Sequence, residues 1–160
     1  MRKAFLLGML VWGLALAQGL PRVGFMEAVR AAQAWSRIPT PAEEISLSWS
    51  QGQPRYAVDL AKGRRLLQVY VDGMTGRVLG AKPLRERALG ARAWLREPPG
   101  VPLGEAVKSA QKALKTREFP EQVAYQIWGG RPVLRMDFSQ VQAILDARTG
   151  AYLGQGPRGR

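Results

Sequence analysis

The chain has 160 residues, a mass of 17.6 kDa and a formal net charge of +12, with 46% hydrophobic and 22% charged residues. This length and composition are typical of one folded domain or two small ones. Cysteine and histidine are absent, which excludes disulfides, thiolate nucleophiles, Cys- or His-based metal sites and Ser-His-Asp catalysis. Depletion of Asn, Cys and His with an excess of arginine is compatible with a thermophilic source, and GC-rich coding bias gives the same composition.

The N-terminus predicts a secretory signal peptide over residues 1–17. Arg2 and Lys3 form a positive segment, residues 4–14 are almost continuously apolar, and Ala-Leu-Ala ending at Ala17 supplies the small residues of a cleavage site. An uncleaved membrane anchor is the alternative, although the apolar run is shorter than the ~20 residues that a spanning helix needs. We therefore expect cleavage near Ala17 and an extracytoplasmic protein, either periplasmic or released.

The rest of the chain contains one pattern twice. Residues 27–33, Glu-Ala-Val-Arg-Ala-Ala-Gln, recur as residues 105–111, Glu-Ala-Val-Lys-Ser-Ala-Gln, at an offset of 78. Further along, Asp72 matches Asp146 at an offset of 74, so the first copy carries four extra residues. We expect the insertion at residues 61–64, in a turn between two strands, because hairpin tips tolerate insertions.

Each copy is predicted to form one helix followed by strands. Apolar residues recur at helical spacing within residues 25–36 and 103–114, and each segment has a charged opposite face. After each helix the apolar residues alternate with polar ones, which is typical of strands with one buried face. The expected strands cover residues 45–49, 56–60, 67–71 and 78–79 in the first copy, and 123–127, 134–138, 141–145 and 152–153 in the second.

This pattern predicts an α+β fold of two tandem units. Each unit is expected to pack one helix on one face of a small antiparallel sheet of three to four strands. We expect unit 1 at residues 20–80 and unit 2 at residues 101–154. Residues 81–100 are expected to form a linker that is partly helical, and residues 155–160 a flexible tail.

The most distinctive local motif of the sequence is Asp-x-x-Thr-Gly, which occurs once in each copy of the repeat. An Asp carboxylate can accept backbone N–H bonds from the residues two and three positions ahead, and Gly supplies a positive φ, so the motif predicts a hairpin turn. The alternative is a pair of carboxylates that bind a cation or take part in catalysis. Calcium favours six to eight oxygen ligands, and neither Asp has a second acid nearby in the sequence, so we expect no metal and no cofactor. The motif residues are Asp72, Thr75, Gly76, Asp146, Thr149 and Gly150.

These residues carry a resemblance to a known family. Residues 69–79, Val-Tyr-Val-Asp-Gly-Met-Thr-Gly-Arg-Val-Leu, resemble the end of a PepSY domain, and residues 143–153 form a second, looser copy. The resemblance implies a small extracytoplasmic α+β module. Such modules occur in the propeptides of thermolysin-type secreted metalloproteases and in stand-alone exported proteins, and the proposed role is to hold a peptidase inactive or to regulate it. The family has no catalytic residues.

The sequence and the resemblance favour an exported, non-catalytic binding module, which regulates or inhibits an extracytoplasmic peptidase. A sheet edge or hairpin could occupy the substrate cleft by β-augmentation. The candidate binding residues are Lys62, Arg64 and Arg65 in the basic insertion and Trp128 beside a Gly-Gly turn. A solvated turn is the alternative interpretation of the insertion.

A second hypothesis assigns the positive charge to the cell envelope. A basic exported protein could be an adaptor that binds anionic lipid, wall polymer or a sensor protein, and nucleic acid is not an expected partner. An enzyme is a third possibility, because Glu43 and Glu44 are adjacent acids. Without His or Cys only carboxylate-pair or Lys/Tyr chemistry is left, so we expect no catalytic activity. The oligomeric state is left open.

Overall fold

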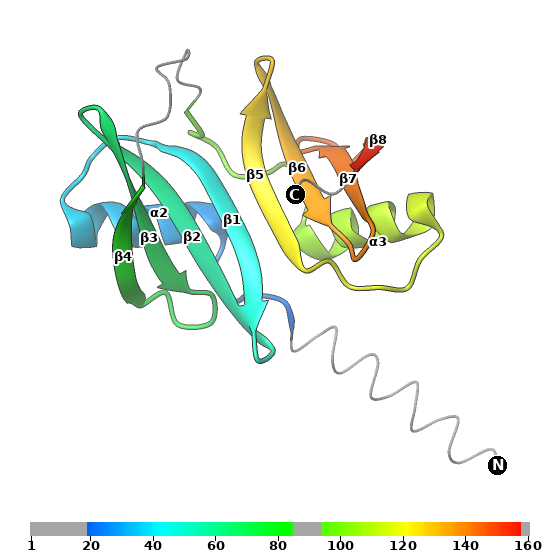
Figure 1. The fold of residues 1–160 in the computed structure, drawn as a ribbon, viewed down its shortest axis with the longest axis horizontal. Coiled ribbons are helices and arrows are strands. Elements are labelled where there is room, and N and C mark those ends of the chain that lie inside the picture. Colours follow the sequence, from blue (N-terminus) through cyan, green and yellow to red (C-terminus); the bar gives the residue numbers. More distant parts are fainter. Residues whose placement is uncertain (1–18, 85–93, 158–160) are drawn as a thin grey trace.

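The computed structural model describes residues 19–84 and 94–157 (Figure 1). The predicted signal peptide, residues 1–17, lies outside the described residues. No helix in the described part of the chain is long and apolar enough to cross a bilayer. The elements in chain order are α2 (Phe25–Ser36), β1 (Ala42–Ser50), β2 (Gln53–Lys62), β3 (Arg65–Asp72), β4 (Val78–Leu84), α3 (Leu103–Leu114), β5 (Gln122–Trp128), β6 (Arg131–Asp137), β7 (Val141–Asp146) and β8 (Tyr152–Pro157).

All strands of the described residues belong to one eight-stranded antiparallel sheet, in the order β4-β3-β2-β1-β5-β6-β7-β8. The expectation of two tandem helix-on-sheet units is therefore wrong. The error arises at β1 and β5, which pair with each other along five residues. Alternation along a strand identifies its buried face but does not identify its neighbours. Left unpaired, β1 and β5 would be exposed sheet edges, and their pairing satisfies both rows of backbone groups.

The β1–β5 pairing joins equivalent positions of the sequence repeat. Ser46 lies opposite Ala124, which is the residue that matches it at the offset of 78. Because the two strands run antiparallel, this register relates the two halves of the sheet by an approximate two-fold rotation, as in an isologous dimer interface. Equivalent turns of the two halves consequently lie at opposite ends of the sheet.

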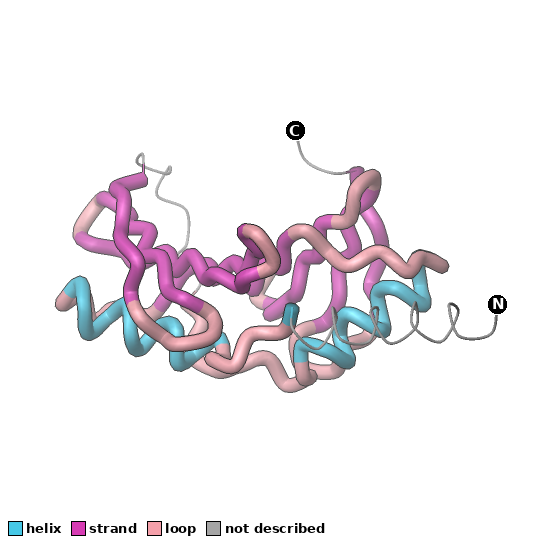
Figure 2. The backbone as a smooth tube through the Cα atoms, turned by 90° about the horizontal axis from the view of Figure 1, so that it is seen from below, coloured by secondary structure: helices cyan, strands magenta, loops and turns pink. Residues whose placement is uncertain are grey.

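Both helices lie on the same side of the sheet (Figure 2). α2 packs against strands of the first half, and α3 packs against β7 and β8. Side chains that face the helices are buried because the strands alternate, whereas no described helix covers the opposite face. The largest fully buried side chains are Val29, Ile45, Leu47, Tyr56, Val58, Leu60, Val69, Leu95, Leu134, Met136, Phe138 and Leu145.

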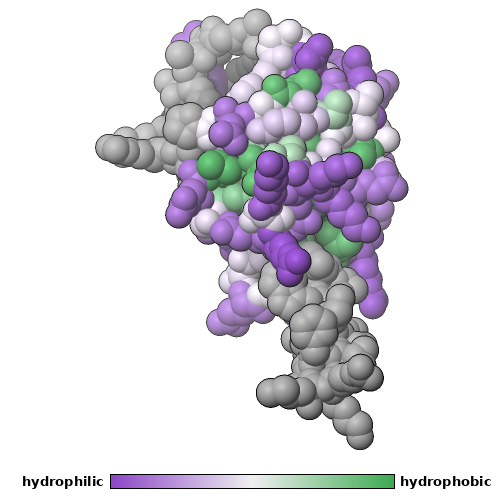
Figure 3. All heavy atoms as spheres, turned by 90° about the vertical axis from the view of Figure 1, so that its right-hand side faces the viewer, coloured by the Kyte–Doolittle hydropathy of each residue, from purple (hydrophilic) through white to green (hydrophobic). Residues whose placement is uncertain are grey.

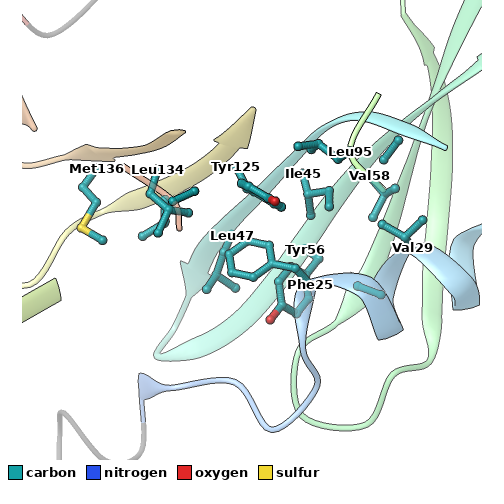
Figure 4. Packing of buried hydrophobic residues seen from close by; sticks show 14 of the residues in the cluster. Phe25, Val29, Ile45, Leu47, Tyr56, Val58, Leu95, Tyr125, Leu134 and Met136 are labelled. Atoms are coloured by element: carbon teal, nitrogen blue, oxygen red, sulfur yellow. The ribbon is translucent and has the colours of Figure 1, made fainter. Parts of the chain in front are cut away.

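The junction between the halves is filled by aromatic side chains (Figure 4). Phe25 of α2 makes edge-to-face contacts with Tyr56 of β2, at a centroid distance of 5.3 Å, and with Tyr125 of β5, at 5.7 Å. Leu95 is also buried there, and its backbone N–H donates to the carbonyl of Ala42 at the start of β1. A single hydrophobic core therefore runs through both halves.

Two expected boundaries are also wrong. β4 continues to Leu84, so the linker begins after residue 84 rather than at 81. The helix expected there falls mainly on residues 85–93, outside the described part, and residues 94–100 are not helical. At the C-terminus, residues 155–157 belong to β8 rather than to a flexible tail, because they pair with β7.

Replacing the ring at the junction should destabilise the whole sheet. Phe25→Ala is expected to lower the free energy of unfolding by about 3–5 kcal/mol, because it removes a buried aromatic that contacts both halves. Urea denaturation followed by tryptophan fluorescence and far-UV circular dichroism should give one coincident transition for both proteins.

Met26→Ala, at a half-buried neighbour on the same helix, serves as the control and should cost less. Two separate transitions in the unsubstituted protein would contradict the single core.

Candidate functional site

The Asp72 motif closes the turn between β3 and β4. The carboxylate Oδ1 of Asp72 accepts the N–H groups of Met74, at 2.8 Å, and Thr75, at 2.9 Å. Gly76 follows with a φ of 77° and donates its N–H to the carbonyl of Asp72. The hydrogen bonds from Thr75 and Met74 lower the pKa of the carboxyl.

The Asp146 motif repeats this geometry between β7 and β8. Its Oδ1 accepts the N–H groups of Arg148, at 2.8 Å, and Thr149, at 3.1 Å, and these bonds lower the pKa of Asp146. Gly150 has a φ of 78°. In each motif one carboxylate oxygen is thus committed to the backbone of its own hairpin. The two motifs lie at opposite ends of the sheet, so the structure does not bring the two carboxylates together.

Both hairpin tips also hold the segment that precedes a helix. The carbonyl of Gly73 accepts the N–H groups of Arg22 and Val23, both at 2.9 Å, just before α2. The carbonyl of Ala147 accepts the N–H of Gly100, at 2.8 Å, just before α3. This role of the motif was missed from the sequence, because the bonds join segments that are about 50 residues apart and use only backbone atoms.

The acidic residues do not form a metal site in the described part of the chain. Across residues 19–84 and 94–157 there is no group of three or more His, Cys, Asp or Glu side chains that could hold a metal ion. Glu43, one of the two adjacent acids, lies at a β-bulge where β1 shifts its register against β2.

The four extra residues of the first copy lengthen the β2–β3 hairpin. Two additional residue pairs, Ala61 with Leu66 and Lys62 with Arg65, extend it. In the second copy the equivalent hairpin is shorter. Its last hydrogen bond before the turn is donated by the backbone N–H of Phe138 to the carbonyl of Val141. The predicted binding residues Lys62, Arg64 and Arg65 are all exposed at the longer tip.

Trp128, the fourth predicted binding residue, ends β5 and is 46% exposed. Because β2 and β5 both run antiparallel to β1, Trp128 lies at the same end of the sheet as Lys62. The cations of the β2–β3 tip and Trp128 are separated by β1, so they share an end of the molecule without forming one compact site. We call this the basic end, defined by residues 62–65 and 128–131.

The face of the sheet without helices is polar. Gln68 donates to Asp59 at 2.9 Å, and the hydroxyl of Tyr70 donates to Gln68 at 2.8 Å. In the second half Gln142 donates to Asp137 at 2.7 Å. The surface seen from the β8 side is largely hydrophilic, and its hydrophobic residues form separate small areas (Figure 3).

Two clefts were not predicted from the sequence. One, of about 410 Å³, lies between residues 20–25 and the segment around residues 98–104, and includes Tyr56 and Leu134 of the sheet. Burial, with a smaller contribution from Glu27, raises the pKa of Tyr56, whose hydroxyl donates to the carbonyl of Val23. The other, of about 270 Å³, lies between residues 94–100 and the β5–β6 hairpin. Both are bounded by connecting segments, whose positions depend on tertiary contacts.

Comparison with known proteins identifies the fold. No family model matches the chain, and no curated protein matches it. A solved structure, described as a "putative lipoprotein" from Clostridium difficile 630, superposes with a TM-score of 0.68 at 15% sequence identity. The match covers 86% of this chain and 95% of that one. At this identity the similarity shows a shared fold alone, and membership of the PepSY family stays a prediction.

The lowered pKa of Asp72 predicts a pH-dependent contribution to stability. A carboxyl whose folded-state pKa lies below its unfolded value of about 3.9 stabilises the protein above that pH, and the contribution is lost as the pH falls through the folded-state pKa. Asp72→Ala should therefore lower the melting temperature at pH 7, and the difference from the unsubstituted protein should shrink towards pH 2. Thermal unfolding followed by circular dichroism at several pH values measures this, and a difference that is constant with pH would contradict the assignment.

Proposed function

We propose that the chain is an exported, envelope-associated binding protein that has no catalytic activity of its own and regulates an extracytoplasmic peptidase. The signal-peptide pattern of residues 1–17 and the PepSY-like sequence of residues 69–79 support this proposal. The description of the Clostridium difficile protein as a "putative lipoprotein" agrees with a location in the envelope. The carboxylates of Asp72 and Asp146 hold hairpin turns, which agrees with a role in binding rather than in catalysis.

The proposal rests mainly on the length and the exposed basic tip of the β2–β3 hairpin. The hairpin is longer than its counterpart in the second half by two residue pairs, and its tip presents Lys62, Arg64 and Arg65 to solvent. The buried residues Ala61 and Leu66 anchor its base. An exposed hairpin on a rigid sheet can enter the cleft of a partner, and its cations can pair with acidic groups around that cleft.

Trp128 contributes a second contact at the basic end. A tryptophan that is 46% exposed offers a large apolar surface at little cost in side-chain entropy, and such residues are common at the centres of interfaces. The partner therefore presents an acidic rim to the hairpin and an apolar surface to the indole.

Inhibition of secreted metallopeptidases tests the proposal. The protein should slow casein cleavage by at least one member of a panel of such enzymes. The triple variant Lys62→Ser/Arg64→Ser/Arg65→Ser should inhibit about tenfold less well, because three interfacial charges are lost. The matched control is Lys108→Ser/Lys112→Ser/Arg117→Ser, which removes three exposed cations elsewhere.

Two outcomes would decide against peptidase regulation. Unaltered cleavage across the panel at a large excess of the protein would contradict it. Binding to anionic vesicles that weakens steeply with salt, and that both triple variants reduce equally, would favour the basic envelope adaptor. The net charge of +12 is the observation that favours this second function, a basic adaptor of the envelope.

A further inference from the structure

The cleft beside the β5–β6 hairpin is a candidate binding site that does not depend on the proposed function. It has a volume of about 270 Å³ and lies between residues 94–100, the ends of β5 and β6, and the tip of the β7–β8 hairpin. This size suits one amino-acid-sized group rather than a larger organic ligand.

The internal repeat explains why space exists here. In the first half Trp49 occupies the equivalent position of the sheet, and its indole Nε1–H donates to the carbonyl of Gly19. Its ring also packs edge-to-face on Phe119 at a centroid distance of 4.8 Å. The matching residue in the second half is Ile127, which lies opposite Pro132 just as Trp49 lies opposite Pro54. Ile127 lines the cleft, and its side chain is much smaller than an indole.

Backbone and hydroxyl hydrogen bonds fix the walls of the cleft. Gly100 donates to Ala147 at 2.8 Å, and the hydroxyl of Tyr125 donates to the carbonyl of Glu97 at 2.7 Å. A Cβ atom at Gly100 would lie 2.5 Å from the carbonyl oxygen of Arg148, so glycine is required for this close approach. Rigid walls keep the space open without a ligand and reduce the entropy lost on binding.

The polar groups of the cleft favour an anion. Trp94 lines it through its ring, because the indole Nε1 is buried and does not face open space. The guanidinium of Arg96 lies 5.6 Å from the centre of the Trp94 ring, and Arg148 also lines the cleft. The lining therefore contains two arginines and one acidic residue, Glu97.

The pKa of the Tyr125 hydroxyl depends on charged residues that line the same cleft. Burial and the nearby Glu97 raise the pKa of the Tyr125 hydroxyl, whereas Arg148 lowers it. Glu97 and Arg148 therefore both act on a hydroxyl at the wall of the cleft. The remaining lining side chains include Leu95, Pro98, Ile127, Pro132 and Ala147, which are apolar.

We propose that this cleft binds a carboxylate carried on a short apolar chain. The carboxylate pairs with Arg96 and Arg148, and the apolar chain takes the volume that an indole fills in the first half. Two sources have this chemistry: the C-terminal residue of a polypeptide with an aliphatic side chain, and a free short carboxylic acid.

Indole N–H resonances of the 15N-labelled protein test the site. The probes are N-acetyl-glycyl-leucine, its C-terminal amide, and hexanoate, and the Trp94→Phe variant assigns the signal. We expect the peptide acid to shift the Trp94 indole resonance and to bind at least about tenfold more tightly than the amide. Equal binding of hexanoate would identify a free acid as the source, and binding of the peptide alone would identify a polypeptide C-terminus.

Three variants separate the site from general effects on the fold. Arg148→Ser removes one of the two cations that line the cleft, and should weaken binding of the peptide acid about tenfold. Ile127→Trp should abolish binding, because it supplies the side chain that fills the equivalent position in the first half. Trp35→Phe, at an exposed tryptophan of α2 outside the lining, should bind like the unsubstituted protein, and unchanged backbone amide spectra show that each variant is folded.

The proposal is overturned if no probe moves the Trp94 signal at millimolar concentration. It is also overturned if the acid and the amide bind equally, or if folded Ile127→Trp binds as tightly as the unsubstituted protein.

Discussion

The architecture depends on the antiparallel pairing of β1 with β5. This pairing places equivalent residues of an internal repeat, Ser46 and Ala124, directly opposite each other. The arrangement is that of an isologous dimer interface formed within a single chain. It removes two sheet edges, and it lets Phe25 contact tyrosines from both halves. A half of this size would have only a marginal core by itself, whereas the joined sheet has one continuous core.

The approximate two-fold symmetry makes the differences between the halves informative. The turn motifs, the helices and the strand registers are repeated, because they support the fold. Two features are not repeated. The first half has a longer β2–β3 hairpin with an exposed basic tip, and the second half has a cleft where Ile127 replaces the bulk of Trp49. A side chain that only maintained packing would be under the same constraint in both halves, and these departures are therefore the places where we propose binding.

Helices, strands and turns were predictable because their causes are local. The spacing of Phe25, Val29 and Ala32 identified the buried side of α2, and alternation through Ile45 and Leu47 identified the buried face of β1. The Asp-x-x-Thr-Gly turns follow from the chemistry of an Asp side chain and a glycine. The docking of these turns on residues 22 and 100 was not predictable, because it uses backbone atoms that every sequence contains.

The sequence by itself determined the repeat, the local elements, the position of the insertion and the charge. The tertiary structure decided that the two copies share one sheet, that the basic hairpin and Trp128 lie at the same end, and that a cleft opens beside Ile127. The physical reason is that a strand's pattern specifies which face is buried but carries little information about which edge it will meet. Edges, ends and clefts depend on contacts between residues far apart in the chain, such as Ala42 with Leu95 and Gly100 with Ala147.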